Sequence, residues 1–323
     1  MKFTKITTAL AAGVLAMTSA SVAFATETLK FAHVYEIGSP YHKNAEWAAE
    51  EIAKKTDGRV EMKVFPASSL GKEVEINEGL GIGAVDVIYT GPSFVERYYG
   101  PIAISDYPFI MRGFDHWESY RGSELFAELS EGYHEATGNQ VLGLVYYGQR
   151  HVTSNKPILV PEDMKGLKIR VPNSPLMLMF PNAVGANPTP MAFSEVYLAL
   201  QQGVVDAQEN PLPTIQFKKF YEVQSNINLT GHILNSLLII ASDDALARLG
   251  DDEAVVREVL IEAAKRSSDE IYQAETDLIS WFRDQGITVN EIDKAPFQAA
   301  VKPLLTGDGV PYTLDHYKRL GEL

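Results

Sequence analysis

The 323-residue chain contains no cysteine. This absence excludes disulfide bonds, thiolate metal sites and cysteine nucleophiles. A protein of this length without cross-links must be stabilised by its apolar core alone. That requirement suits a large two-domain protein better than a small secreted module.

Positive charge is scarce: 28 Lys and Arg residues face 42 Asp and Glu residues, which gives a formal net charge of −14. Such an acidic chain argues against nucleic acid and anionic membrane surfaces as partners. It also repels anionic ligands at long range, so an anion site would require a local concentration of positive groups. The alternative is that the acidity serves solubility alone.

Long hydrophobic runs are confined to the N-terminus. Lys2 and Lys5 precede an apolar stretch over 9–22, which ends in the A-x-A pattern at residues 23–25. These features predict a signal peptide over residues 1–25 and export to the periplasm, with a mature chain beginning at Thr26. An uncleaved membrane anchor is the alternative, although the stretch is short for a span.

The common enzyme signatures are absent, because the chain has no G-x-S-x-G, P-loop, G-x-G-x-x-G or H-E-x-x-H motif. The glycine-rich run at 79–83 falls where a helix is expected to end, so helix capping explains it better than phosphate binding. The seven histidines show no metal-ligand spacing. We therefore expect neither a metal nor a cofactor. An exported enzyme using Glu73 and a histidine as an acid–base pair remains a minor alternative.

Alternating and helical patterns predict an α/β fold. In the first part, strands are expected at 29–33, 60–64 and 86–89, with helices at 40–57 and 74–80. A second α/β pattern has strands at 141–147, 168–171, 204–208 and 237–241 and a helix at 194–202. A long helix is expected over 251–285. These elements predict a two-lobed clamshell with crossover strands and a long interdomain helix, with lobe I at 26–147 plus 236–275 and lobe II at 148–235 plus 276–323.

Two residues of the second pattern are candidate anion ligands. Arg170 lies near the tip of a short strand that Pro172 ends, where a guanidinium can hold a carboxylate through two parallel hydrogen bonds. A solvent-facing arginine is the alternative. Asn210 precedes Pro211 and should be extended, with its amide directed into a cleft or engaged in ordinary turn chemistry.

Three segments together, 168–172, 193–203 and 206–211, resemble the periplasmic substrate-binding subunits of tripartite ATP-independent periplasmic (TRAP) transporters, of the DctP type. The resemblance covers the whole chain after the signal peptide. It implies a periplasmic binding protein of two α/β lobes bridged by a long helix. It also implies a small organic anion as ligand and the membrane subunits of a TRAP transporter as partners, with no catalysis.

The resemblance also implies roles for individual residues. Arg170 would form the salt bridge to the ligand carboxylate, and Arg150 and Asn210 would help to hold the anion. Phe193 would pack on the ligand, and Glu73 would meet its hydroxyl groups.

The second lobe is most similar to the sialic-acid-binding branch of this family, but the chain departs from it at Gly91 and Phe94. These positions carry an acidic residue and an arginine in that branch, so sialic acid is not expected. His33, Tyr89 and Gln149 still offer hydrogen bonds. We therefore predict a sugar acid such as a uronate or aldonate, with a dicarboxylate, hydroxy acid or sulfonate as alternatives. A monomer is expected, and a sensory role is left open.

Overall fold

The computed structural model describes residues 26–307 and 309–323, so the predicted signal peptide lies outside it. A nine-stranded sheet runs through the molecule in the order β2-β1-β3-β8-β4-β7-β5-β6, and β9 pairs with β8. The strands are β1 (Glu27–Ala32), β2 (Val60–Phe65), β3 (Val87–Thr90), β4 (Asn139–Ser154), β5 (Lys168–Val171), β6 (Asn187–Pro190), β7 (Ala207–Pro211), β8 (Asn226–Ser242) and β9 (Thr288–Asn290).

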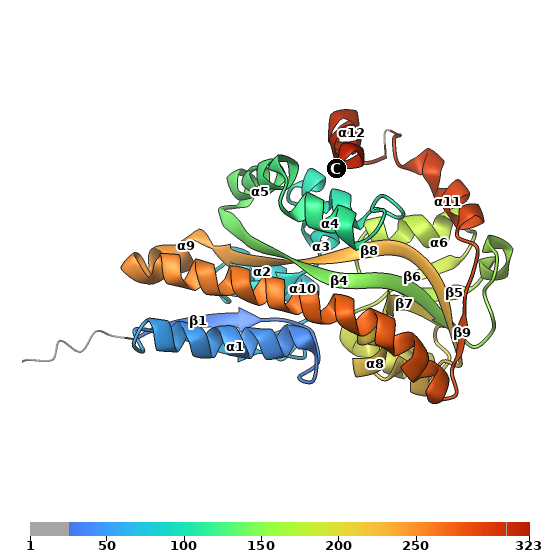
Figure 1. Cartoon of the computed structure of the whole chain (residues 1–323), viewed down its shortest axis with the longest axis horizontal. Helices are drawn as coiled ribbons and strands as arrows, with labels where there is room; N and C mark the ends of the chain where they lie inside the picture. The colour runs from blue at the N-terminus through green and yellow to red at the C-terminus, as the bar shows by residue number, and fades with distance from the viewer. Residues whose placement is uncertain (1–25, 308) are drawn as a thin grey trace, which may run out of the picture.

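Helices cover this sheet on both sides (Figure 1). The first lobe holds α1 (Pro40–Lys55), α2 (Glu73–Gly81), α3 (Pro92–Val95), η1 (Gly100–Asp106), α4 (Phe114–Arg121), α5 (Glu124–Thr137) and α9 (Asp243–Ala247). The second lobe and the C-terminal region hold η2 (Pro161–Met164), η3 (Leu176–Leu178), α6 (Met179–Ala183), η4 (Phe193–Glu195), α7 (Val196–Gln201), α8 (Leu212–Phe217), η5 (Phe220–Glu222), α11 (Ala295–Val301), η7 (Lys302–Leu304) and α12 (Leu314–Glu322). None of the helices within the described ranges is both long and apolar enough to cross a membrane.

The first lobe follows the sequence closely. β1 pairs in parallel with β2 and β3, as expected for alternating strands and helices. Helix α1 begins where Ser39 accepts a hydrogen bond from the backbone N–H of His42 and Pro40 occupies the first turn. Its buried face includes Ala45, Ala48 and Ile52, which confirms the predicted helix.

Two very long strands, β4 and β8, connect the lobes. They pair antiparallel along 16 and 17 residues, far beyond the strands predicted at 141–147 and 237–241. The prediction fell short because the extensions carry polar residues that lack an alternating pattern. Asn228, Thr230 and His232 are nevertheless buried, and their side chains form hydrogen bonds inside the protein.

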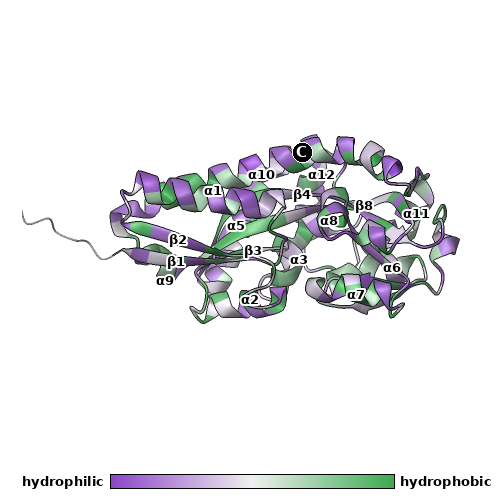
Figure 2. Ribbon diagram, turned by 90° about the horizontal axis from the view of Figure 1, so that it is seen from below, coloured by the Kyte–Doolittle hydropathy of each residue, from purple (hydrophilic) through white to green (hydrophobic). Residues whose placement is uncertain are grey.

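The long helix α10 (Glu253–Asp284) confirms the predicted interdomain helix. It packs on α1 in the first lobe, along β4, and on α8 in the second lobe. In Figure 1 it runs nearly the whole length of the molecule, and in Figure 2 it lies on the side opposite α2 and α7.

Three details differ from the prediction. Strand β7 spans 207–211 rather than 204–208, so Asn210 lies within a strand instead of after it. The helix predicted at 194–202 begins as the 3₁₀ turn η4 and continues as α7. Helix α12 packs on α5, although 276–323 was predicted to belong to the second lobe, and His116 of α4 also lies 2.8 Å from the carbonyl of Leu320.

Strand β4 changes register where it passes between the lobes. Gly148 has φ +114° beside a shift in pairing between Tyr146 and Gly148. This bulge directs the Gln149 N–H toward Glu275 of α10, whose Oε1 accepts it at 2.6 Å. Oε2 of Glu275 accepts the Tyr146 hydroxyl at 2.6 Å. The long helix is thus fixed to the crossover strand at the irregular point of the strand.

Gly148→Ala should destabilise the protein by about 3 kcal/mol, because an L residue is strained at this φ and the new Cβ would also clash. That Cβ would lie 2.7 Å from Cβ of Pro211 and 2.9 Å from Oε1 of Glu275. Gly58→Ala is the matched control, since its φ is +76° and nothing lies within 4 Å of the added Cβ. It should cost only about 1–2 kcal/mol. Urea unfolding measures the stability of both variants. Equal losses of stability in Gly148→Ala and Gly58→Ala would show that the contact with α10 does not contribute.

Candidate ligand-binding cleft

A cavity of about 230 Å³ lies between the two lobes. An engineered cavity of about 150 Å³ holds benzene, so this one has room for a larger organic molecule. Much of its wall is apolar or aromatic. The lining residues are Val34, Tyr35, Lys72, Glu73, Val74, Glu75, Gly91, Ser93, Phe94, Tyr147, Arg150, Arg170, Pro172, Asn173, Met177, Met191, Ala192, Phe193, Asn210, Asn235 and Leu237.

Arg170, on β5, brings an uncompensated positive charge to this cavity. Its side chain is 2% exposed. Nε and Nη2 donate to the carbonyl oxygen of Met191 at 3.0 and 2.6 Å. Within the described part of the chain, no carboxylate forms an ion pair with it, and Nη1 has no hydrogen-bond acceptor. Burial lowers the pKa of Arg170 to about 10, a sign that its charge is poorly solvated.

Arg150, on β4, lies beside it in a different state. Its guanidinium forms a buried ion pair with the Glu209 carboxylate, and Nη1 donates to Oδ1 of Asn235 at 2.8 Å. Burial alone would raise the pKa of Glu209, but Arg150 and His232 lower it to about 2. The charge of Arg150 is therefore balanced by Glu209, and the guanidinium is held in a fixed orientation.

Asn210 lies at the same end of the cavity, because β7 runs between β4 and β5. On β7, Asn210 pairs with His151 of β4, and Gln208 pairs with Arg170 of β5. Its Oδ1 accepts the Tyr147 hydroxyl at 3.3 Å, and its Nδ2 donates to Oε1 of Gln208 at 2.6 Å. This end of the cavity thus combines two guanidinium groups with an amide whose orientation is set by its neighbours.

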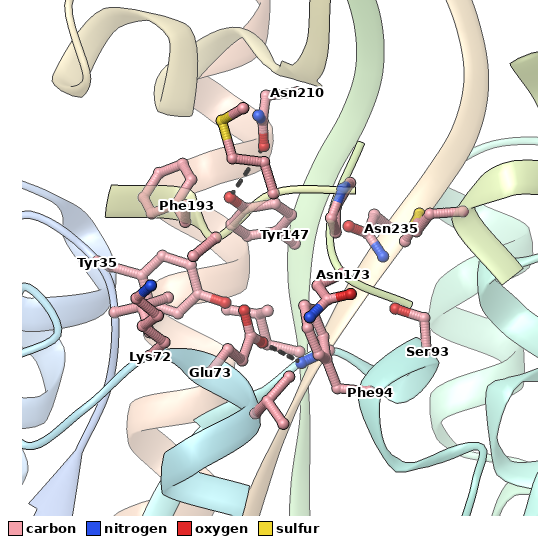
Figure 3. Close-up of a pocket in the computed structure, with 18 of the residues that line it drawn as sticks. Tyr35, Lys72, Glu73, Ser93, Phe94, Tyr147, Asn173, Phe193, Asn210 and Asn235 are labelled. Atoms are coloured by element: carbon pink, nitrogen blue, oxygen red, sulfur yellow. Dashed lines mark hydrogen bonds between the residues drawn. The ribbon is translucent and has the colours of Figure 1, made fainter. Parts of the chain in front are cut away.

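Glu73 lies at the other end, where the first turn of α2 begins. Figure 3 shows it across the cavity from Asn210. Oε1 accepts the Gly91 N–H at 3.0 Å and the Thr90 hydroxyl at 3.4 Å. Burial raises the pKa of Glu73 to about 7, although the Gly91 N–H and Arg170 act in the opposite direction.

Phe193 closes one side of the cavity. It lies in η4 of the second lobe, with its ring centroid 6.3 Å from that of Tyr35 in the first lobe. The ammonium of Lys218 lies 5.0 Å above the Phe193 ring and forms an ion pair with Glu36 at 2.7 Å. Aromatic and cation–π contacts of this kind stabilise a closed arrangement of the lobes.

Two further contacts connect the lobes at the cavity. Lys72 forms an ion pair with Glu195 at 2.6 Å, and the Ser174 hydroxyl donates to the carbonyl of Ser93 at 2.8 Å. Lys72 and Glu195 are about half exposed, so their pair contributes little by itself. The described structure is therefore a closed form.

Five of the eight predicted site residues meet in this cavity, and His33, Tyr89 and Gln149 do not line it. The His33 ring turns toward α1, with Nε2 3.3 Å from Nδ1 of His42, and burial lowers its pKa to about 3. Tyr89 is fully buried against Phe31, and the side chain of Gln149 lies beside Gly231. Position at a strand end did not reveal which way these side chains point.

The lining residues that were not predicted as ligands include Tyr35, Tyr147, Asn173 and Asn235. Figure 3 places Tyr35 and Phe193 on one side of the cavity and Asn173 and Asn235 on the other. Strand alternation could not separate Tyr35 from His33, because residues two apart in an extended segment share a side, and their ring centroids lie 5.9 Å apart. Asn235 gave no signal either, because the N-terminal part of its strand, before residue 237, was not recognised.

The histidines of the described chain all lie outside the lining of the cavity, so the predicted pairing of Glu73 with a histidine does not occur there. Across residues 26–307 and 309–323, no group of three or more histidine or carboxylate side chains could hold a metal ion.

Known proteins are similar to this chain in both sequence and fold. A solute-binding protein of Roseobacter denitrificans is 35% identical over 302 residues, which cover 93% of each chain. A TRAP periplasmic solute-binding protein of Actinobacillus succinogenes with bound L-galactonate has a TM-score of 0.86 and 29% identity, covering 92% of this chain and 100% of its own. One from Sulfurospirillum deleyianum with bound succinate has a TM-score of 0.85 and 30% identity, covering 92% and 99%.

The model of the DctP family, described as bacterial extracellular solute-binding protein, family 7, matches residues 31–307. That range includes both lobes, the crossover strands and every residue of the cavity described above. The chain therefore belongs to the DctP family, the solute-binding proteins of TRAP transporters.

Proposed function

We propose that this protein is the periplasmic solute-binding subunit of a TRAP transporter and that it captures a sugar acid, a uronate or aldonate, for secondary active uptake. The observation that carries this proposal is the charge of Arg170, which is buried at the cavity without a carboxylate partner. A carboxylate ligand would supply that partner. The membrane subunits would then receive the ligand from the closed form.

The geometry of Arg170 suits a carboxylate. Two of its nitrogens are anchored on Met191, so the guanidinium plane is fixed before a ligand arrives. Such pre-organisation reduces the entropy lost on binding. Arg150 and Asn210, which line the same end, can add donors without adding an uncompensated charge, since Glu209 balances Arg150.

The rest of the cavity suits a hydroxylated chain. Glu73, Asn173 and Ser93 offer polar atoms along it, and Tyr35 and Phe193 offer flat apolar faces on which carbon–hydrogen surfaces of a sugar can pack. The L-galactonate in the similar protein of Actinobacillus succinogenes supports this assignment. The succinate in the Sulfurospirillum deleyianum protein keeps a dicarboxylate as the competing ligand class.

Capture proceeds by closure of one lobe over the other. The anion first binds Arg170 and Arg150 on the second lobe. Tyr35 and Glu73 of the first lobe then cover it, and contacts such as that between Tyr35 and Phe193 form. Closure removes water from the ion pair and strengthens it. The crossover strands at Gly148 and helix α10 provide the flexible connection.

Binding without turnover separates this function from an exported enzyme. Ligand recovered after long incubation with the protein should be chemically unchanged by mass spectrometry. A sensory role would give the same result. Reconstitution of uptake in vesicles that contain the TRAP membrane subunits distinguishes a transport role from a sensory role.

Arg170→Ala should weaken sugar-acid binding by roughly two to three orders of magnitude, because truncating one partner of a buried ion pair typically costs about 3–5 kcal/mol. The affinity of Arg170→Lys should lie between those of the parent and Arg170→Ala, since lysine keeps the charge but lacks the planar pair of donors. Thermal-shift screening of residues 26–323 against aldonates, uronates, dicarboxylates, hydroxy acids and sulfonates identifies the ligand, and calorimetry measures the loss.

Lys168→Ala is the control for Arg170, because it removes a positive charge two residues earlier on the same strand from an exposed position. It should bind the ligand as the parent does. Unchanged affinity in Arg170→Ala would refute the site.

Phe193→Ala should speed ligand release about thirtyfold while leaving association nearly unchanged. The variant loses buried apolar area and the aromatic contact with Tyr35, together worth about 2 kcal/mol in the closed state. Stopped-flow fluorescence measures both rates. Leu198→Ala, on the neighbouring helix and 54% exposed, is the control and should not change either rate. A slower association with normal release would instead indicate a role in encounter.

A further inference from the structure

The cavity has unequal ends: two arginines at one and the carboxyl group of Glu73 at the other. We propose that Glu73 restricts the ligand to a single carboxylate, so that the site accepts an aldonate or uronate and rejects the dicarboxylate of the same length. This inference rests on the proposed function and narrows its ligand class.

The position of Glu73 is rigid. Its Oε1 is held by the Gly91 N–H, and its own carbonyl accepts the side-chain N–H of Asn77 at 2.7 Å. Asn77 in turn donates to Thr90 at 2.8 Å, which ties the start of α2 to the end of β3. For Oε2, no hydrogen-bond donor among the described residues lies within reach. A ligand hydroxyl at this end could supply that donor, whereas a second carboxylate could not.

The charge balance of the cavity leads to the same restriction. Arg150 is balanced by Glu209, so Arg170 contributes the remaining positive charge of that end. One ligand carboxylate satisfies it. A second carboxylate at the far end would meet Glu73 with no cation to compensate either group, and like charges placed together cost several kcal/mol.

Neighbouring cations do not relieve this repulsion. Lys72 precedes Glu73 in the chain, but its ammonium pairs with Glu195 across the cleft. The Glu75 carboxylate folds back on the backbone N–H of Lys72 at 2.9 Å. Tyr35 is the titratable group of the β1–α1 loop that faces Glu73, and burial raises its pKa, so it stays neutral.

The remaining titratable groups that face Glu73 are Tyr147 and Arg150 of β4 and Arg170 of β5, all across the cavity. The Tyr147 phenol is neutral, and Thr90 and Gly91 of the β3 end do not titrate. Burial holds the pKa of Glu73 near 7. Protonation of Glu73 as the pH falls below 7 therefore removes the opposing charge, and diacid binding should strengthen toward low pH.

The test compares three ligand pairs that differ only in a terminal hydroxymethyl or carboxylate group: L-galactonate with galactarate, D-gluconate with D-glucarate, and D-mannonate with D-mannarate. Titration calorimetry at pH 8 should show that the parent prefers the monoacid of the pair it recognises by about a hundredfold. In Glu73→Gln this preference should fall to less than about tenfold, because the amide donates to the second carboxylate. At pH 5.5 the parent's preference for the monoacid should fall toward that of Glu73→Gln.

Glu78→Gln is the matched control, since it makes the same change on the same helix at an exposed side chain that pairs with Arg97. It should keep the full preference. Equal binding of monoacid and diacid by the parent, or an unchanged preference in Glu73→Gln, would overturn the charge restriction while leaving sugar-acid capture intact. Failure of these six acids, and of the uronates in the thermal-shift screen, to bind the parent would overturn the proposed function and this inference with it.

Discussion

The unbalanced charge of Arg170 is the constraint around which the cleft is organised. A guanidinium buried without a counter-ion destabilises the empty closed form, because desolvation is not repaid by an ion pair. Arg150, on β4 beyond the intervening strand β7, shows that the fold can provide a carboxylate where it needs one. Leaving Arg170 unpaired makes the closed state depend on an anion from outside. In the proposed mechanism, the same residue accounts for both affinity and the coupling of binding to closure.

Closure also requires lobes that move while one sheet stays continuous. The crossover strands meet this requirement through irregular pairing near Gly148 and Gly231, where φ is positive and the ladder shifts. Glu275 holds α10 to the same point through the Gln149 N–H. A bend there changes the lobe angle with few broken hydrogen bonds, since the bulge already interrupts regular pairing. The proposed hinge at Gly148 and the cavity residue Arg150 therefore lie on the same strand.

Most of the fold could be predicted from the sequence, whereas the residues that line the cavity could be predicted only in part. Apolar spacing gave α1, α10 and the parallel strands, because those elements bury one face. It missed the parts of β4 and β8 in which buried polar side chains, held by hydrogen bonds, interrupt the apolar pattern. Resemblance identified Arg170 and Glu73, but strand-end position could not distinguish Tyr35, which lines the cavity, from His33, which faces α1. Side-chain direction in loops depends on tertiary packing that one sequence does not reveal.

In the proposed mode of binding, the carboxylate of the ligand and the rest of its structure are recognised by different residues. The arginine end would accept any carboxylate, and similar folds hold both L-galactonate and succinate. Selectivity must then come from the opposite lobe, where Tyr35 fills space and Phe94 replaces a polar group expected for sialic acid. In that set, Glu73 is the carboxyl group that we propose distinguishes a hydroxyl from a second carboxylate.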